Sequence, residues 1–197
     1  MGDISAFDII VCLMLLGGMA VGFARGFVRQ TADLAALYVG VAVAAQYTPL
    51  IAPSLDRRLT TWPSYTVTAL TFFLLVAVVT GVLSLVAQNL LTTSQRQELN
   101  ELSHIAGFAI GALTTLAFIS IAMPVVRYAV AGSWGTAEGA RYLIVQALNK
   151  AYLSPLFDSF TPMVLSLIRP LLPSGLPDVL RGRLADVGPT LSLLLHL

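Results

Sequence analysis

Charged residues and cysteine are scarce in this chain. Asp, Glu, Lys and Arg make up 11% of its 197 residues, against about 25% in ordinary soluble domains. Apolar residues make up 57%, and the mean hydropathy is +0.84. A net charge of +1 gives no electrostatic attraction for a polyanion, which argues against nucleic acid as a partner. The single cysteine, Cys12, allows no internal disulfide or thiolate metal site and is interpreted as small apolar filler. The composition indicates a membrane protein.

Long uncharged runs divide the first two thirds of the chain. About 20 apolar residues cross a bilayer as a helix, so these runs predict four spanning helices, near residues 8–24, 32–49, 65–88 and 103–126. The first run is short, and a cleaved signal peptide is the alternative reading. It follows MGDISAFD, which contains two acids and no base, whereas a signal peptide begins with positive charge. We therefore favour a retained span.

Small residues recur at every fourth position on three of the expected spans. Apolar side chains gain little by meeting one another in lipid, so membrane helices associate where small residues let their backbones approach. Each row predicts a helix contact face, with the partner either in the same chain or in a second copy. The alternative is that Gly and Ala are simply common in apolar helices. The rows are Gly18, Gly22 and Gly26; Ala32, Ala36, Gly40 and Ala44; and Ser103, Gly107, Gly111 and Thr115.

Arg25 and Arg29 stand one helical turn apart, directly after the first span. Asp33 follows Arg29 by four residues, so these two side chains can pair if the turn is helical. Arginines at such a boundary can reach lipid phosphates and can fix the orientation of a span. We predict that Arg25, Arg29 and Asp33 form a topological anchor, and the functional alternative is binding of a lipid headgroup or an anionic partner.

The stretch FDIIVCLMLLGGMAVGFARGFVRQTADLAALYVGVAVA resembles the beginning of the colicin V production protein family (CvpA). That family shows an Asp that opens the first helix, a Gly before an Arg-Gly-Phe-x-Arg turn, and a Gly-rich second helix. SHIAGFAIGALTT is a looser match, through Gly107 and Gly111, and the Ser-Pro-Leu of AYLSPLFDSF is similar to the family's tail. The residues that match the first motif are Asp8, Gly22, Arg25, Gly26, Phe27, Arg29 and Gly40.

The chain departs from the family pattern at several polar positions. Gln30 stands where relatives often have Glu. Near the second motif, ionic and Arg-Gly residues of the relatives are replaced by Ser103, His104, Thr114 and Thr115. These departures do not change the fold that the resemblance implies. They argue against a network of ionic side chains shared with the family.

The resemblance covers residues 5 to about 128 and implies a small four-span protein of the bacterial inner (plasma) membrane. In the case that named the family, the protein is required for secretion of a peptide toxin. In some relatives a similar membrane domain precedes a protease outside the membrane, which implies that both termini lie outside the cytoplasm. Basic residues in the loops are nearly balanced between the two sides and add little to this expectation.

The sequence changes character after Arg127, where AGSWGTAEG forms a Gly-rich connection. We expect a four-helix transmembrane domain at residues 1–128 and an amphipathic helical tail at 129–197. Amphipathic helices suit a segment that lies along the membrane or folds back over the bundle.

Three helices are expected in this tail. The first covers residues 140–152, with Leu143, Ala147 and Ala151 on one side, flanked by Ile144 and Leu148. The second begins with Ser154 as N-cap and Pro155 at its first position, and a short third helix covers 177–185. A fifth span at 157–172 is disfavoured because it would carry Asp158, Pro162, Arg169 and Pro170 into the membrane. The apolar face of the second helix consists of Phe157, Phe160, Val164, Leu167 and Ile168.

Motifs of the common catalytic classes are missing. The two histidines, His104 and His196, are far apart in the chain, and there is no His-Glu-x-x-His, Gly-x-Ser-x-Gly or phosphate-loop pattern. No ionisable residue falls near the middle of an expected span, where coupled pumps generally need one. We expect no enzyme, no catalytic residues, no cofactor and no metal. His104 is interpreted as an interfacial residue, with a titrating or gating role as the alternative.

Two classes of function remain for an all-α membrane protein of this kind. The first is a non-catalytic scaffold or accessory protein that supports secretion of a toxin or peptide, or envelope maintenance, by docking partners on its small-residue faces and amphipathic tail. The second is an oligomeric membrane channel or export component lined by Thr, Ser and Gly. The expected partners are membrane lipids, further copies of the chain, and secretion or envelope proteins.

Overall fold

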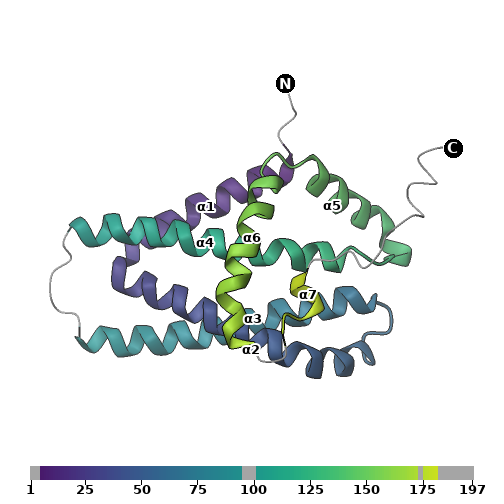
Figure 1. Cartoon of the computed structure of the whole chain (residues 1–197), viewed down its shortest axis with the longest axis horizontal. Helices are drawn as coiled ribbons and strands as arrows, with labels where there is room; N and C mark the ends of the chain where they lie inside the picture. Colours follow the sequence, from purple (N-terminus) through teal and green to yellow (C-terminus); the bar gives the residue numbers. More distant parts are fainter. Residues whose placement is uncertain (1–4, 95–100, 173–174, 182–197) are drawn as a thin grey trace.

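The computed structural model describes residues 5–94, 101–172 and 175–181, and in these ranges the chain is helical with no strand. Four long helices form a bundle: α1 (Ala6–Arg25), α2 (Phe27–Asp56), α3 (Ser64–Ser94) and α4 (Glu101–Ala129) (Figure 1). Each of them contains a window long and apolar enough to cross a membrane. The predicted all-α fold with four spans is thereby confirmed.

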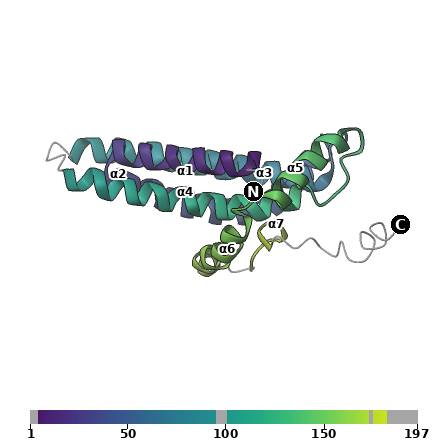
Figure 2. The ribbon, with the colours of Figure 1, turned by 90° about the horizontal axis from the view of Figure 1, so that it is seen from above.

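Two helix pairs build the bundle. α1 packs mainly on α4, α2 packs mainly on α3, and the pairs meet where α2 contacts α4. Figures 1 and 2 show these four helices running side by side. The connection between α1 and α2 lies at one end of the bundle, and the connection between α2 and α3 lies at the other.

α2 is longer than the predicted span at 32–49, both at its start and at its end. It begins at Phe27 because Gly26 alone makes the turn, with φ of 77°, a backbone conformation that glycine adopts without steric cost. It continues to Asp56 through Pro49 and Pro53. Proline disfavours a helix interior in water, but it is tolerated in membrane helices because neighbouring groups satisfy the freed backbone atoms.

The lengths of the helices can be compared with the thickness of a membrane. α1 has 20 residues and is about 30 Å long, close to the thickness of the hydrocarbon core of a bilayer. Its start lies beside the second half of α4, where Val11 shares a buried cluster with Ile119 and Met123. The last turns of α4 therefore extend past the start of α1. α2 and α3 are also about ten residues longer than α1.

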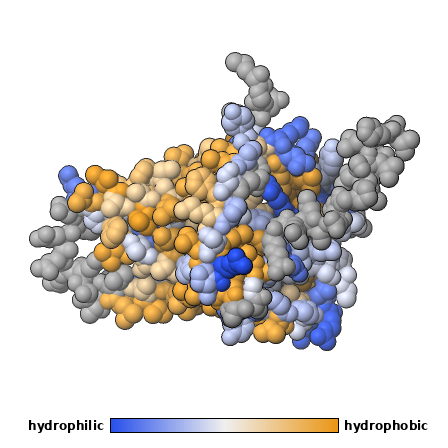
Figure 3. Space-filling model, viewed as in Figure 1, coloured by the Kyte–Doolittle hydropathy of each residue, from blue (hydrophilic) through white to orange (hydrophobic). Residues whose placement is uncertain are grey.

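Large apolar side chains are exposed along the bundle, among them Leu13 and Leu16 on α1 and Leu74 and Leu85 on α3. Figure 3 shows hydrophobic residues over much of the bundle and hydrophilic residues gathered at the end occupied by α5. A continuous apolar surface of this kind marks a membrane-facing region. Cys12 is exposed on α1, within this apolar surface, and its interpretation as small apolar filler stays a prediction.

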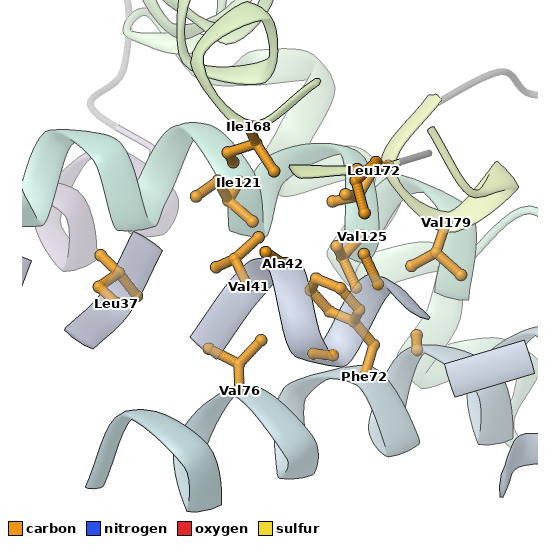
Figure 4. Close-up of a cluster of buried hydrophobic side chains, with 14 residues drawn as sticks. Leu37, Val41, Ala42, Phe72, Val76, Ile121, Val125, Ile168, Leu172 and Val179 are labelled. Atoms are coloured by element: carbon orange, nitrogen blue, oxygen red, sulfur yellow. The ribbon is translucent and has the colours of Figure 1, made fainter. Parts of the chain in front are cut away.

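The principal core lies between α2, α3 and α4 and includes Val41, Phe72 and Val125, all of them fully buried (Figure 4). Ile168 and Leu180, from the tail, belong to the same cluster. The segments before and after residue 128 thus share one hydrophobic core, although the division into domains at 1–128 and 129–197 stays a prediction.

The described part of the tail contains three α-helices and two short 3₁₀ turns. The α-helices are α5 (Glu138–Lys150), α6 (Ser154–Ile168) and α7 (Asp178–Arg181), and the 3₁₀ turns are η1 (Gly135–Ala137) and η2 (Arg169–Leu171). α6 lies across the bundle rather than along it (Figure 1), and Figure 2 shows it nearly end-on at one face. α7 falls within the helix predicted at 177–185, whose remaining residues lie outside the described ranges.

α5 begins at Glu138, two residues before the predicted position, and Glu138 ties the start of α5 to the preceding 3₁₀ turn. The Glu138 carboxylate accepts a hydrogen bond from the Trp134 amide at 2.8 Å and pairs with Arg141 at 2.9 Å. The Ser133 hydroxyl, the Arg141 guanidinium and the Trp134 amide hold the pKa of Glu138 below its ordinary value. Leu148 and Ala151 of the predicted apolar side are buried, whereas Leu143 is exposed, so the prediction is wrong at Leu143.

α6 also differs from the prediction at its start and on its apolar face. Its N-cap position is Leu153, not Ser154, and no side chain of α6 itself caps it. Phe157 and Ile168 are buried against the bundle, whereas Phe160 and Leu167 of the predicted face are exposed. The helix is apolar both on the side that packs on the bundle and along one exposed edge. The prediction combined residues from these two surfaces into a single face.

Candidate functional site

The glycine rows of α1 and α4 pack directly against each other. A Cβ atom added to Gly22 would lie 2.3 Å from the Gly107 carbonyl oxygen, and one added to Gly111 would lie 2.3 Å from the Gly18 carbonyl oxygen. Such distances are too short for any side chain, so the two backbones are in contact. The row on α1 and the row on α4 thus have each other as partners within one chain.

The row on α2 packs on α3 through its glycine. A Cβ atom on Gly40 would lie 2.2 Å from the Thr80 hydroxyl oxygen. Ala36 and Ala44 are buried, and Ala32 is half-buried. The sequence left open whether these faces meet inside one chain or between copies, and the structure places all three contacts inside the chain.

An ion pair lies at the turn between α1 and α2. The Arg25 guanidinium contacts the Asp33 carboxylate, with 2.5 Å between Nη1 and Oδ2. The anticipated pairing of Arg29 with Asp33 is therefore wrong. The one-residue turn at Gly26 folds the end of α1 back against the second turn of α2, which brings Arg25 to Asp33, while Arg29 is half-buried.

A cavity of about 390 Å³ opens beside this ion pair, and its lining is mostly apolar. It lies where α1 and α3 face each other without packing together, with α2 and α4 behind them. Its large apolar lining residues are Met14, Val21, Leu37 and Phe118. Its polar or small lining residues are Gly17, Gly18, Arg25, Gln30, Asp33, Thr80, Ser84, Thr114 and Thr115.

Two polar atoms of this lining are buried without a partner in the described residues, namely Oε1 of Gln30 and the hydroxyl oxygen of Thr80. Gln30 is 4% exposed, and its amide nitrogen donates to the Thr114 hydroxyl at 3.4 Å. Buried polar atoms are nearly always hydrogen-bonded, because leaving one unpaired costs free energy. The cavity can therefore hold a polar group with hydrogen-bond donors.

Comparison of the chain with known protein families gives a match. The family model described as colicin V production protein matches residues 7–162, which include all four spans, α5 and the first half of α6. The chain belongs to the colicin V production protein family. The comparisons with curated proteins and with solved structures give no match.

Asp8, which matches the family's Asp at the start of the first helix, holds the elbow between α5 and α6. It is 6% exposed, and its carboxylate accepts hydrogen bonds from the amides of Tyr152 and Leu153, both at 3.1 Å. It also accepts from the Ser5 amide at 3.3 Å. Asp8 thus caps the start of α6 from another helix, the role that the sequence assigned to Ser154.

Ser5 completes the attachment of this elbow to α1. Its hydroxyl donates to the Ala147 carbonyl at the end of α5, at 3.0 Å, and it caps α1 through the Phe7 amide. Sequence reasoning missed both roles, although Ser5-x-x-Asp8 is a capping-box pattern that marks the start of α1. The pattern does not reveal the partners in the tail, which are more than 140 residues away.

The far end of α6 is fixed by side chains of α2. The Tyr38 hydroxyl donates to the Leu167 carbonyl, and the Gln46 amide donates to the Leu171 carbonyl at 2.8 Å. Between the two ends, the Thr161 hydroxyl donates to the Ser120 carbonyl of α4 at 3.2 Å. α6 is therefore held on the bundle at its start, middle and end.

His104 lies at the opposite end of α4, next to the end of α1. Its Nδ1 is 2.6 Å from the Phe23 carbonyl oxygen, and its ring lies 5.2 Å from the Phe23 ring. In the described part of the chain, no group of His, Cys, Asp and Glu has the arrangement of a metal site.

Proposed function

We propose that this multi-pass membrane protein is a non-catalytic accessory or scaffold component of the bacterial inner membrane, supporting secretion of a toxin or peptide, or envelope maintenance. The membership of the colicin V production protein family supports the setting. The observation that carries the scaffold role is the attachment of α6, whose two ends and middle are hydrogen-bonded to α1, α2 and α4. A helix fixed in this way presents a defined surface to a partner.

The exposed edge of α6 supports a position at the membrane surface. Phe160, Met163 and Leu167 are exposed, and they line an apolar hollow of about 460 Å³ together with α2 and α4. The other lining residues include Leu34 and Leu113, which lie nearer the α1–α2 end than α6 does. The apolar edge of α6 thus faces the membrane-spanning part of the bundle, and its other exposed side is left for a partner.

The packing of the bundle disfavours a channel within one copy. Beyond the cavity at the Arg25–Asp33 ion pair, the space between α2, α3 and α4 is filled by buried Val41, Phe72, Val76 and Val125. Ions and polar solutes need a continuous polar or wet path, and this cluster interrupts it. Small-residue faces, the other docking surfaces expected from the sequence, are used inside the chain.

Release of α6 tests the scaffold role. We expect Asp8→Ala to abolish toxin export or envelope maintenance in cells while the protein remains inserted in the membrane. Asp56→Ala is the matched control, because Asp56 accepts from Ser64 at the α2–α3 connection, away from α6, and we expect it to retain function. Full function of Asp8→Ala, with the elbow shown by proteolysis to be released, would refute the proposal.

Flux through liposomes separates the scaffold from the alternative of an oligomeric channel. We expect liposomes that contain the purified protein to be no more permeable to ions and small solutes than liposomes with the denatured protein. Permeability that rises with the amount of folded protein would favour the channel.

Both termini are proposed to lie outside the cytoplasm, and other copies of the chain and secretion or envelope proteins are the proposed partners. A reporter fused to the C-terminus tests the orientation. Activity of a reporter that works only in the cytoplasm would contradict it.

A further inference from the structure

We propose that the apolar hollow between α2, α4 and α6 binds an acyl chain of a membrane phospholipid. The hollow has a volume of about 460 Å³. Apart from Thr31, Tyr38 and Ser120, every residue that lines it is apolar. The lining includes three residues that Figure 4 labels, one from each of these helices: Leu37, Ile121 and Ile168.

The hollow is unsuited to water. The hydroxyl groups of Thr31 and Tyr38 already donate to backbone carbonyls, and the hydroxyl oxygen of Ser120 is buried. A water molecule enclosed in a protein needs about two to four polar partners, which this wall does not supply. An apolar wall gains dispersion contacts when apolar atoms lie against it. The fitting occupant is therefore an apolar group.

The hollow lies at the depth of the hydrocarbon core, with its wall on α4 formed between residues 113 and 121. Gly111, just before this stretch, contacts Gly18 of α1. Ile119, within the stretch, shares a buried cluster with Val11. The hollow thus lies beside the first half of α1, the helix whose length matches the hydrocarbon core. At this depth the surrounding solvent consists of lipid chains.

α6 restricts what can occupy the hollow. It crosses the face formed by α2 and α4 (Figure 1), and its Thr161 hydroxyl donates to the Ser120 carbonyl of α4 at 3.2 Å. A spanning helix from a second copy needs about 30 Å of unobstructed length along the bundle, and α6 blocks this face within the span. A flexible acyl chain can lie against a shorter stretch, because each of its CH₂ groups makes its own contacts.

The hollow is open to the surrounding lipid on one side. Met163 and Leu167 of α6 line it, as does Leu113 of α4, and each of these side chains is more than half exposed. They continue the exposed apolar surface of the bundle. A chain from a neighbouring phospholipid can therefore enter from the bilayer and pack against three helices, whereas a lipid elsewhere on the bundle lies against its outer surface.

A photoreactive residue identifies the occupant. p-Benzoylphenylalanine replaces either Phe160, which lines the hollow, or Phe108, which is exposed on α4 outside it. The full chain is reconstituted in dioleoyl phosphatidylcholine, extracted into lipid-free detergent and irradiated, and the adducts are identified by mass spectrometry. We expect a phospholipid adduct at Phe160 about tenfold more abundant than at Phe108, because detergent exchanges lipid more easily from an outer surface than from the hollow.

The other outcomes of this experiment contradict the proposal. A crosslink from Phe160 to a second copy, or to residues 182–197 of the same chain, in place of the lipid adduct would assign the hollow to protein. Equal phospholipid adducts at Phe160 and Phe108, or none at Phe160, would show that the hollow retains no lipid chain.

Variants that fill the hollow test its location. Ala35 is exposed and lines the hollow on α2, so Ala35→Phe adds a ring to this space, and we expect it to lower the retained phospholipid, counted by native mass spectrometry, about tenfold. Ala20→Phe is the same exchange at an exposed position of α1 outside the hollow and should retain the lipid. If Ala35→Phe fails to fold, Leu113→Trp, which fills the hollow from α4, decides. Unchanged retention in the folded filling variant, or equal loss in Ala20→Phe, would refute the site.

Discussion

Single glycine positions determine how closely α1 and α4 approach. Gly22 contacts the backbone of Gly107 and Gly111, whereas Gly81 on α3 has open space where a Cβ atom would be placed. Both residues are glycines in long apolar helices. Only the surroundings distinguish them, so identical substitutions at the two positions separate the cost of packing from the effect of helix propensity.

Gly22→Ala is expected to destabilise the protein, because overpacking against backbone costs about 1–3 kcal/mol. Gly81→Ala is the control and should be neutral or stabilising by up to about 1 kcal/mol, since alanine is the better helix former. Unfolding in mixed detergent micelles with increasing SDS measures both. Equal stability of the two variants would show that α1 and α4 are not in backbone contact.

Asp8 is the residue whose loss should release α6. A buried carboxylate that accepts from the Tyr152 and Leu153 amides contributes roughly 1.5–3 kcal/mol for each hydrogen bond to the charged group. In Asp8→Ala we expect faster hydrogen exchange at residues 152–153, with little change at the core of α2. Unchanged protection at these two amides would show that Asp8 does not hold the elbow.

At the scale of elements, the turn between α1 and α2 determines which charge is paired. A connection of one residue returns the chain so sharply that Arg25 meets Asp33. Arg29 lies one helical turn before Asp33 on α2, yet the Asp33 carboxylate contacts Arg25. The position of Gly26, with its positive φ, therefore decides which of two neighbouring arginines stabilises the site.

The two arginines should consequently differ in their effect on stability. Arg25→Gln leaves the mostly buried Asp33 without its ion pair and is expected to cost about 1–3 kcal/mol, at the lower end because Arg25 is 43% exposed. Arg29→Gln should stay within about 0.5 kcal/mol. Melting temperatures in detergent compare the two variants, and Asp33→Asn added to Arg25→Gln should recover part of the loss. A larger effect of Arg29→Gln would contradict the pairing.

For the whole molecule, the difference in helix length implies that one end of the bundle stands outside the membrane. α1 alone matches the hydrocarbon thickness, and α2, α3 and α4 extend past its start. α5 and α7 lie toward this end, and α6 crosses the bundle near its middle (Figures 1 and 2). The bundle thus carries its own structured cap on one side of the membrane.

Intrinsic fluorescence can test this placement without any substitution. Both tryptophans of the chain, Trp62 and Trp134, belong to the protruding end, and Trp134 donates to the carbonyl of Ala129, the last residue of α4. In liposomes we expect acrylamide to quench the emission more strongly than lipids brominated at mid-chain. Strong quenching by the brominated lipids would place this end inside the bilayer.

Local features of the sequence determined the four spans, the small-residue rows and the departure of the tail from the spanning pattern. Long apolar runs and four-residue spacing are properties of short segments, and hydrocarbon surroundings leave a helix as the available structure for them. Tertiary structure decided which rows meet, that Arg25 rather than Arg29 pairs with Asp33, and that Asp8 caps α6 across more than 140 residues. These outcomes depend on contacts between segments that are far apart in the chain. The sequence contains the residues that make these contacts, but it does not show which of them lie close together in the folded protein.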